Sequence, residues 1–188
     1  MYKEYNIKTL YLIRHAKSDW GIPVLSDSMR QLTKRGLRDL KTMGSYIALR
    51  RIKPDLILSS CALRAQLTAD ALAEKIEYSK NISYMNELYL ARPEIILNVL
   101  AAQEDTHESI FLVGHNPALT ELVNMFTDNH FKKFPTLGIF SLKLDIDSWE
   151  NISEISNAKI DFFIFPKQFK YYMPEQIQST LKLSHYDE

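Results

Sequence analysis

Cysteine is almost absent from this sequence, since Cys61 is the one thiol among 188 residues. A single thiol excludes an intramolecular disulfide and is typical of a reducing compartment, so we interpret Cys61 as a small packing residue. The formal net charge is zero, because 23 basic residues balance 23 acidic ones. That balance gives no support for binding to nucleic acids or to anionic membranes, so any affinity for anions has to be local.

The sequence also lacks long apolar runs, low-complexity tracts and linkers rich in glycine and serine. No run is long enough to span a bilayer, and charges interrupt the N-terminal stretch before any signal-peptide core could form. We therefore expect a cytoplasmic protein with neither membrane nor nucleic-acid partners. A chain of this length favours one domain, covering 1–188, and we expect it to be a monomer.

Short apolar runs alternate with helical patterns along the first two thirds of the chain. Buried strands are predicted at 9–13, 55–60 and 109–113, with a weaker strand at 82–84. Two later segments, 138–146 and 160–165, alternate apolar and polar residues as half-buried strands do, and a long hairpin connection joins them. The order predicts a three-layer α/β/α sandwich, with a mostly parallel central sheet and antiparallel additions near the C-terminus.

Capping residues mark the helices predicted between these strands. Thr33 is expected to cap a helix whose inner face carries Leu37, Leu40, Gly44, Ile47 and Ala48. A second helix places Ala62, Ala65, Ala69, Leu72, Ala73 and Ile76 on one face. Pro93 is expected to open a third helix, and Asn116 to cap a fourth that has Pro117 in its first turn. A tail helix is predicted after Pro174.

Polar side chains follow three of the predicted strands at the points where those strands end. They are Arg14 and His15 after the first, Ser60 and Arg64 after the second, and His115 and Asn116 after the third. Parallel strands place their carboxyl ends on one edge, where open α/β sheets bind ligands. Guanidinium groups and helix N-termini suit phosphate oxygens, so the sequence predicts a site for a phosphate-sized dianion at this edge.

His15 is the predicted nucleophile of this site. A neutral imidazole can attack phosphorus and carry a covalent phosphoryl group. Arg14 and Arg64 disfavour a second positive charge, so we expect them to keep His15 unprotonated near neutral pH.

Several neighbouring residues are assigned supporting roles. His115 is expected to hydrogen-bond the transferring group, and Ser18 and Asn116 are candidate phosphate ligands. Glu87, after the weak strand, is a candidate general acid, with Asp19 as its rival, and the sequence does not decide between them. Trp20 is interpreted as a core or loop-anchoring residue, as is Trp149.

The motifs together resemble a known family. "RHAKSDW", "SSCALRAQLTA", "VGHNPALTEL", "ELY", "PTLGIFSL" and "FPK", spread over residues 10–167, are similar to the histidine phosphatase (phosphoglycerate mutase-like) superfamily and, within it, to the SixA-type phosphohistidine phosphatases. The resemblance implies that His15 becomes phosphorylated and that Arg14, Arg64 and His115 form the phosphate pocket. It also places Glu87 at the family's acid position. Ala16 replaces the glycine common in the superfamily, and Gln31 stands where this branch usually has proline.

The expected activity is that of a phosphatase that needs neither metal nor cofactor and works through a phosphohistidine intermediate. Phosphohistidine on proteins is the favoured substrate by resemblance, because a P–N bond needs little acid assistance. A small-molecule phosphomonoesterase and a non-catalytic phosphoprotein-binding module remain as alternatives, and a mutase is less favoured. His107, His130 and His185 lack the spacing of metal ligands.

Overall fold

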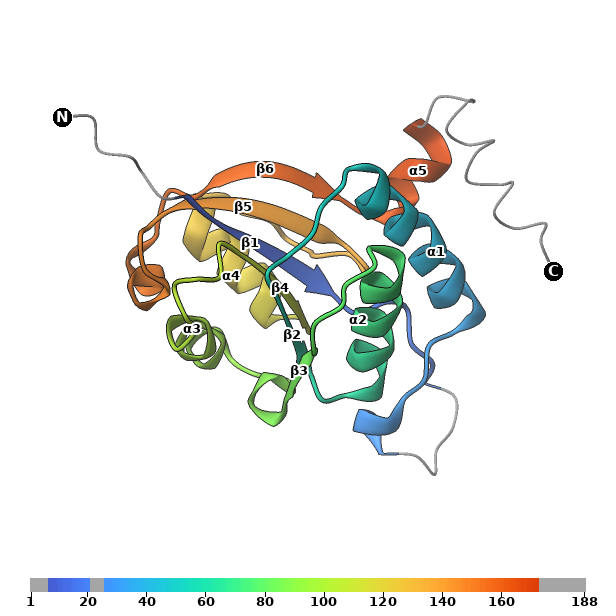
Figure 1. Ribbon diagram of the computed structural model, residues 1–188. Coiled ribbons are helices and arrows are strands. Elements are labelled where there is room, and N and C mark those ends of the chain that lie inside the picture. Colours follow the sequence, from blue (N-terminus) through green and yellow to red (C-terminus); the bar gives the residue numbers. More distant parts are fainter. Residues whose placement is uncertain (1–6, 21–25, 173–188) are drawn as a thin grey trace.

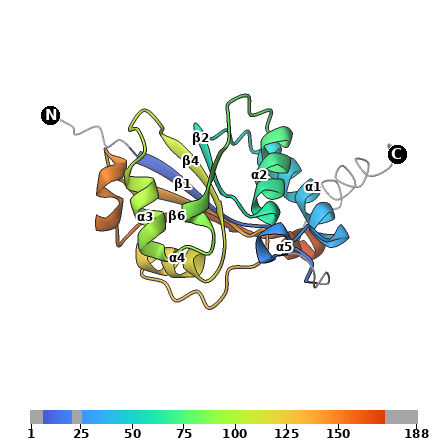
Figure 2. The same cartoon turned by 90° about the horizontal axis from the view of Figure 1, so that it is seen from below.

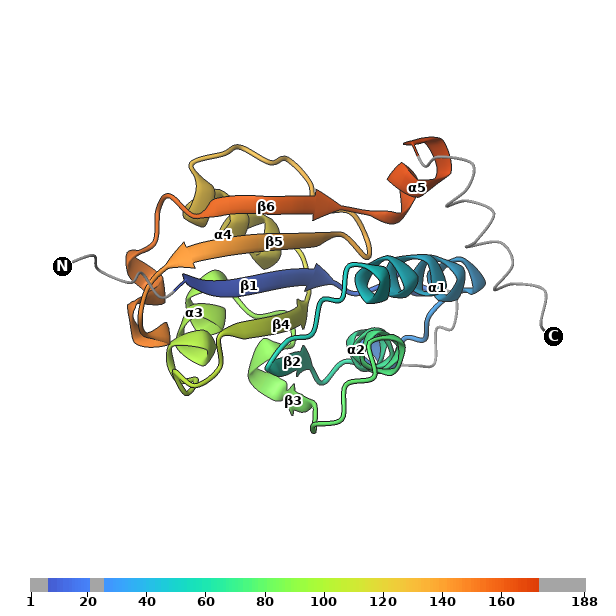
Figure 3. The same cartoon turned by 45° about the horizontal axis from the view of Figure 1, so that its top comes forward.

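A computed structural model describes residues 7–20 and 26–172, and its centre is a six-stranded sheet (Figure 1). The described strands are β1 (Ile7–Arg14), β2 (Leu56–Ser60), β3 (Ser83–Met85), β4 (Ser109–Gly114), β5 (Ile139–Asp145) and β6 (Lys159–Ile164). Their order across the sheet is β3-β2-β4-β1-β5-β6, as Figure 3 shows. β3, β2, β4 and β1 pair in parallel, whereas β5 runs antiparallel to β1 and to β6. The predicted mostly parallel sheet with late antiparallel additions is confirmed.

Helices cover both faces of this sheet. The described α-helices are α1 (Lys34–Leu49), α2 (Leu63–Lys75), α3 (Pro93–Ala101), α4 (Ala118–Thr127) and α5 (Pro166–Tyr172). Short 3₁₀ helices form at η1 (Asp27–Met29), η2 (Asn86–Leu88) and η3 (Trp149–Glu154). Viewed from below, α1 and α2 lie on one side of the sheet and α3 and α4 on the other (Figure 2). The three-layer architecture is therefore as the sequence predicts.

The central strand β1 is apolar on both faces because it contributes to two separate cores. Leu10 and Leu12 pack with α3, α4 and η3, whereas Tyr11 and Ile13 pack with α1 and α2. Since successive strand residues point to opposite faces, a continuous apolar run is what a strand between two helical layers requires. Trp149 is fully buried in the first of these cores, as its predicted anchoring role requires.

Helix α1 begins and packs largely as its sequence predicts. The Thr33 hydroxyl accepts a hydrogen bond from the Gly36 amide at 3.0 Å, which confirms the cap. Gly44 lies against α2, where an added Cβ would meet Lys75 Cγ at 2.8 Å, so close helix packing explains this glycine. Leu37 was assigned to the buried face, but it is half exposed, and Gly36 and Met43 are buried instead.

Three details, at the start of α4, along β5 and at α5, differ from the sequence-based expectation. Asn116 does not cap α4: the N-cap residue is Pro117, and the Asn116 amide instead donates to the Phe134 carbonyl. β5 is buried over most of its length rather than alternating, because β1 and β6 flank it and both faces meet core residues. Pro166 begins α5, which was not predicted, while the tail helix expected after Pro174 lies outside the described residues.

None of the described helices is long and apolar enough to cross a membrane.

Candidate active site

Strand register brings the two histidines together. Arg14 at the end of β1 pairs with Gly114 at the end of β4, and the His15 amide donates to the Gly114 carbonyl at 3.1 Å. His15 and His115 therefore leave the sheet side by side, with ring centroids 5.1 Å apart. The hundred residues between them in sequence are bridged by a parallel β-pairing, as the topology argument requires.

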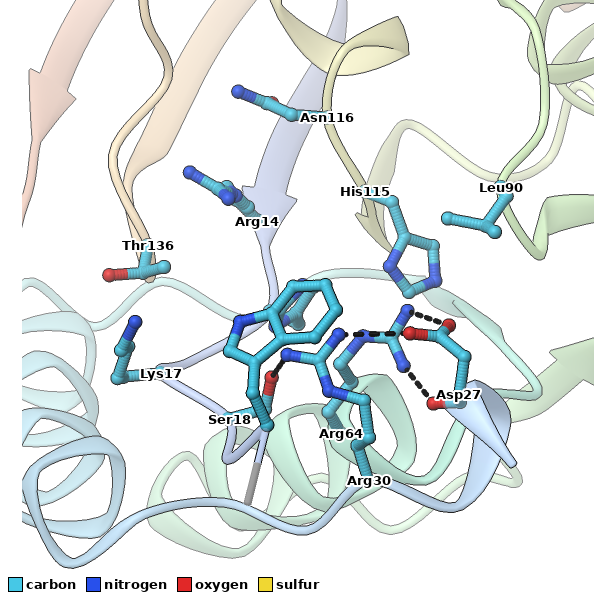
Figure 4. A pocket seen from close by; sticks show the side chains of 12 residues that line it. Arg14, Lys17, Ser18, Asp27, Arg30, Arg64, Leu90, His115, Asn116 and Thr136 are labelled. Atoms are coloured by element: carbon cyan, nitrogen blue, oxygen red, sulfur yellow. Dashed lines mark hydrogen bonds and ion pairs between the residues drawn. The ribbon is translucent and has the colours of Figure 1, made fainter. Parts of the chain in front are cut away.

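These residues share a cavity of about 260 Å³ at the carboxyl edge of the sheet (Figure 4). The residues lining it are Arg14, His15, Lys17, Ser18, Trp20, Asp27, Arg30, Arg64, Leu90, His115, Asn116 and Thr136. All six residues predicted to bind or attack the phosphoryl group at this edge are in this set. The cavity carries four cationic side chains against one carboxylate, so its local charge is strongly positive although the chain is neutral overall.

His15 is held so that one ring nitrogen can act as a nucleophile. Its Nδ1 lies 2.7 Å from the Ala16 carbonyl oxygen, which can only accept, so Nδ1 carries the proton and Nε2 keeps its lone pair. Ala16 is fully buried, and its own amide donates to the Thr68 hydroxyl at 3.0 Å. The segment that orients the imidazole is thereby fixed to α2.

The ring of His15 is neutral at physiological pH. Its pKa is lowered from 6.5 to about 3, chiefly because burial disfavours the imidazolium. The neighbouring His115, Arg64 and Arg14 lower the pKa further, in that order of importance. A neutral His15 is what the sequence predicts, but burial at the sheet edge is a larger cause than the two arginines to which the prediction attributes it.

His115 is buried and fixed to the end of β2. Its Nε2 lies 2.8 Å from the Ser60 hydroxyl, whose oxygen accepts from the Ala62 amide at the start of α2. With the hydroxyl donating to Nε2, the neutral ring carries its proton on Nδ1. Burial is the main cause that lowers the pKa of His115 to about 4, with Arg64 adding to the effect and Asp27 opposing it. His115 is therefore a neutral hydrogen-bonding group whose orientation the serine sets.

Two arginines and His115 keep buried nitrogen atoms without a partner. Arg14 uses Nη1 on the Phe134 carbonyl at 2.7 Å, but its Nε has no hydrogen-bond partner. Arg64 uses both terminal nitrogens on Asp27, and its Nε is likewise unpaired. Nδ1 of His115 is also buried and has no hydrogen-bond partner. Buried polar groups are rarely left unsatisfied, so these three nitrogens indicate a site for an anion.

The loop that holds η1 adds two residues that the sequence analysis missed, Asp27 and Arg30. The Asp27 carboxylate accepts from Arg64 Nη2 at 2.9 Å, from Arg30 Nη1 at 2.9 Å and from the Tyr89 hydroxyl at 2.7 Å. Burial acts to raise its pKa, but these three hydrogen bonds hold that pKa well below its ordinary value. Arg30 also donates to Ser18 at 2.8 Å. An Asp and an Arg three positions apart in a polar loop were the available signal.

The remaining predicted residues are placed less centrally. Ser18 is buried and accepts from Arg30, and Asn116 lines the cavity while its amide holds the same Phe134 carbonyl as Arg14. Glu87 lies in η2, exposed, and is outside the set of lining residues; Asp19 is also exposed. The acid role of either carboxylate stays a prediction.

Trp20, which the sequence analysis assigned to a core or to a loop anchor, is 76% exposed and lines the cavity. A core position is therefore wrong for Trp20, whereas its ring does contact the loop, where it stacks on Arg30.

A buried neutral imidazole in a cationic cavity, at the carboxyl edge of a doubly covered sheet, defines a phosphate-handling α/β enzyme. Comparison with known proteins agrees with this class. The sequence model of the histidine phosphatase superfamily (branch 1) matches residues 10–89. A SixA protein from Agrobacterium tumefaciens is 31% identical with a TM-score of 0.72, over 84% of this chain and 97% of that one. The chain therefore belongs to the histidine phosphatase superfamily.

Two other similar proteins extend the comparison. The structure of the protein histidine phosphatase SixA complexed with tungstate has a TM-score of 0.73 over 86% of this chain and 99% of that one, and at 21% identity it shows the fold. An uncharacterized protein of Mycobacterium leprae is 26% identical over 169 residues, which cover 82% of this chain and all of the relative. The family and the SixA structure at 31% identity support assignment of the protein as a phosphatase.

Proposed function

We propose that the protein hydrolyses phosphohistidine on proteins through a phosphoryl intermediate on His15, without a metal ion. The observation that carries the proposal is the set of three unpaired buried nitrogens around a neutral imidazole: Arg14 Nε, Arg64 Nε and His115 Nδ1. These groups gain partners when a phosphoryl group enters the cavity, and they stabilise charge on its oxygens during transfer. Lys17 and Arg30 line the same cavity and add to the positive field.

The reaction has two displacement steps in this proposal. The Nε2 lone pair of His15 attacks phosphorus while solvent has protonated the other nitrogen of the substrate imidazole. The P–N bond to that imidazole breaks, its electron pair stays on nitrogen, and a neutral imidazole departs. Water then attacks the phosphoryl group on His15 and the second P–N bond breaks. Inorganic phosphate leaves with the protons of the water on its oxygens or released to solvent, so Nε2 is again unprotonated. Arg14 and Arg64 hold the phosphoryl oxygens in both steps, so positioning and charge stabilisation supply most of the catalysis.

The single carboxylate among the lining residues favours a substrate with an easily departing group. Asp27 accepts hydrogen bonds from two arginines and a tyrosine, and its lowered pKa keeps it deprotonated at neutral pH. It is therefore not a proton donor. The imidazole of a phosphoramidate leaves readily once solvent has protonated it, whereas the alkoxide of an alkyl ester needs a positioned acid. This supports phosphohistidine over an alkyl phosphomonoester.

The first test is turnover of p-nitrophenyl phosphate and of a phosphohistidine protein in the presence of EDTA. We expect wild type and His130→Ala to turn over both substrates, and His15→Ala to lose activity by at least about 100-fold, since the nucleophile is removed. Rapid quenching with ³²P-labelled substrate is expected to trap acid-labile, alkali-stable label on His15. Label in His15→Ala, or phosphate binding without any turnover in wild type, would contradict the mechanism; the second result would indicate a binding module.

A second variant pair separates the phosphohistidine proposal from a phosphomonoesterase. Glu87→Gln is expected to slow hydrolysis of an alkyl phosphate and to leave phosphohistidine hydrolysis nearly unchanged, with the exposed Glu94→Gln as the matched control. Faster turnover of alkyl esters than of phosphohistidine, with a strict need for Glu87, would favour the small-molecule alternative.

A further inference from the structure

Trp20 is the most exposed of the large apolar side chains in the described residues, yet its position is fixed. The guanidinium carbon of Arg30 lies 3.4 Å from the centroid of the indole ring, a stacked cation–π arrangement. One face of the ring is thus covered by Arg30. Because 76% of the residue is still exposed, most of it is left uncovered by the described part of the chain and is accessible to a ligand.

Arg30 is itself held by hydrogen bonds from three nitrogens, which gives the indole a defined place beside the phosphate pocket. Its Nε donates to the Asp19 carbonyl at 2.7 Å, Nη1 to Asp27 at 2.9 Å and Nη2 to Ser18 at 2.8 Å. Asp27 and Ser18 are lining residues of the same cavity as Trp20. A ring stacked on a guanidinium that is fixed in this way is a preorganised surface. The side chain therefore loses little conformational entropy when a ligand binds to it.

Leu90 supplies a second exposed apolar side chain at the same cavity. It is 56% exposed, lines the cavity and lies next to His115 in Figure 4. Its backbone adopts a left-handed φ of 48°, a conformation that non-glycine residues avoid unless the surroundings impose it, and such residues concentrate at functional sites. The cavity therefore combines a cationic floor for a phosphoryl group with apolar side chains from two distant segments of the chain.

A phosphoryl group gains no binding energy from exposed apolar surface, but the organic group bonded to it can pack against that surface. We propose that Trp20 is a specificity-determining residue that stacks on a planar leaving group, the imidazole of phosphohistidine or an aryl ring, with Leu90 as an additional apolar contact. The assignment rests on the proposed phosphatase function for its chemistry. The alternative role for Trp20 is to shield Arg30 only, and that role would not distinguish planar from non-planar substrates.

The test compares substrates that share a bond type but differ in the shape of the leaving group. Phosphohistidine and phospholysine both contain a P–N bond, and phenyl phosphate and glycerol phosphate both contain a P–O bond. The measured quantity is the ratio of kcat/KM for the planar member to that for the alkyl member of each pair. In Trp20→Ala and Trp20→Leu we expect this ratio to fall about 2- to 10-fold, the usual worth of one aromatic contact.

Two controls separate stacking from a structural role. Trp20→Leu keeps apolar cover over Arg30 but removes the aromatic face, whereas Trp20→Phe is expected to restore much of the ratio. Met125→Ala changes an exposed apolar residue on α4, outside the lining set, and should not move the ratio. An equal loss on planar and alkyl substrates, or no loss at all, would overturn the assignment.

A binding measurement keeps this inference separable from the proposed function. Phenylphosphonate and methylphosphonate carry no hydrolysable P–O or P–N linkage to the organic group, so their affinities need no turnover. We expect phenylphosphonate to bind more tightly to wild type, by about 2- to 10-fold, and the two ligands to become equal in Trp20→Ala. Equal affinities in wild type would overturn the role of Trp20, whereas absence of phosphohistidine hydrolysis would overturn the proposed substrate only.

Discussion

At the scale of single residues, the site depends on keeping His15 buried and uncharged among cations. Burial is the main cause of its lowered pKa, and the same is true of His115. An imidazole that is neutral in the folded protein but free to take up a proton in the unfolded chain makes stability depend on pH. The nucleophile therefore leaves a signature that can be measured without any substrate.

We predict that the free energy of unfolding falls as the pH is lowered from 7 to 5. The unfolded chain protonates its imidazoles near their ordinary pKa of 6.5, while His15 and His115 stay neutral in the folded protein down to about 3 and about 4. The unfolded state thus binds more protons throughout this window, and each histidine costs up to about 2 kcal/mol of stability at pH 5. Urea unfolding at several pH values measures the slope.

The substitution His15→Asn identifies the source of this slope. Asparagine can still donate to the Ala16 carbonyl but has no titrating group, so the variant should lose about half of the histidine-dependent slope. The exposed His130→Asn serves as the control and should keep the wild-type slope. Parallel curves for wild type and His15→Asn would mean that His15 takes up protons equally in both states.

At the scale of elements, the first turn of α1 fixes one wall of the cavity. The Thr33 amide and hydroxyl both donate to the Lys17 carbonyl, at 2.9 and 3.2 Å. Gly36, in the first turn, faces the same carbonyl oxygen so closely that an added Cβ would lie 2.3 Å from it. Lys17 and Ser18 line the cavity, so the start of a helix sets the position of residues beside the nucleophile.

We expect Gly36→Ala to lower both stability and activity. The methyl group cannot coexist with the Lys17 carbonyl oxygen, and a backbone oxygen cannot rotate away as a flexible side chain can. Either α1 or the 17–18 segment must shift, and overpacking of this kind costs about 1–3 kcal/mol. Chemical denaturation and kcat/KM for p-nitrophenyl phosphate measure the two effects.

The exposed Lys41→Ala in the same helix is the control for this substitution and should change neither quantity appreciably. Gly36→Ala with wild-type stability and activity would show that the contact between the helix and the 17–18 segment is not needed.

Elements with strong local signals could be predicted from the sequence, whereas long-range contacts could not. Apolar runs located β1, β2 and β4, and Thr33 located the start of α1, because burial and capping act on neighbouring residues. Asp27 and Arg30 were missed, since their role depends on folding a polar loop back onto Arg64. Asn116 was assigned to a cap because its sequence context fits one. Its side-chain amide instead donates a hydrogen bond to the carbonyl of Phe134, 18 residues away.

At the scale of the whole molecule, a chain without net charge places four basic side chains around one cavity. Formal net charge is zero, yet Arg14, Lys17, Arg30 and Arg64 line a single cavity with Asp27 as the one carboxylate. Repulsion among these cations and the unpaired buried nitrogens oppose folding of the unliganded protein. An anion that fills the cavity relieves both costs, so its binding has to stabilise the entire fold.

Tungstate, a tetrahedral dianion like phosphate, is therefore predicted to raise the thermal midpoint of wild type. At about 100 times its dissociation constant, a ligand that binds only the folded state adds about 2.7 kcal/mol, which corresponds to roughly 5–10 °C for a chain of this size. Arg14→Gln removes one of the unpaired nitrogens and should abolish most of the shift, while the exposed Arg38→Gln should retain it. Chloride at matched ionic strength separates specific binding from screening. Equal shifts in wild type and Arg14→Gln would place the anion elsewhere. The affinity for a dianion bound at the sheet edge has to fall when the guanidinium at the end of β1 is removed.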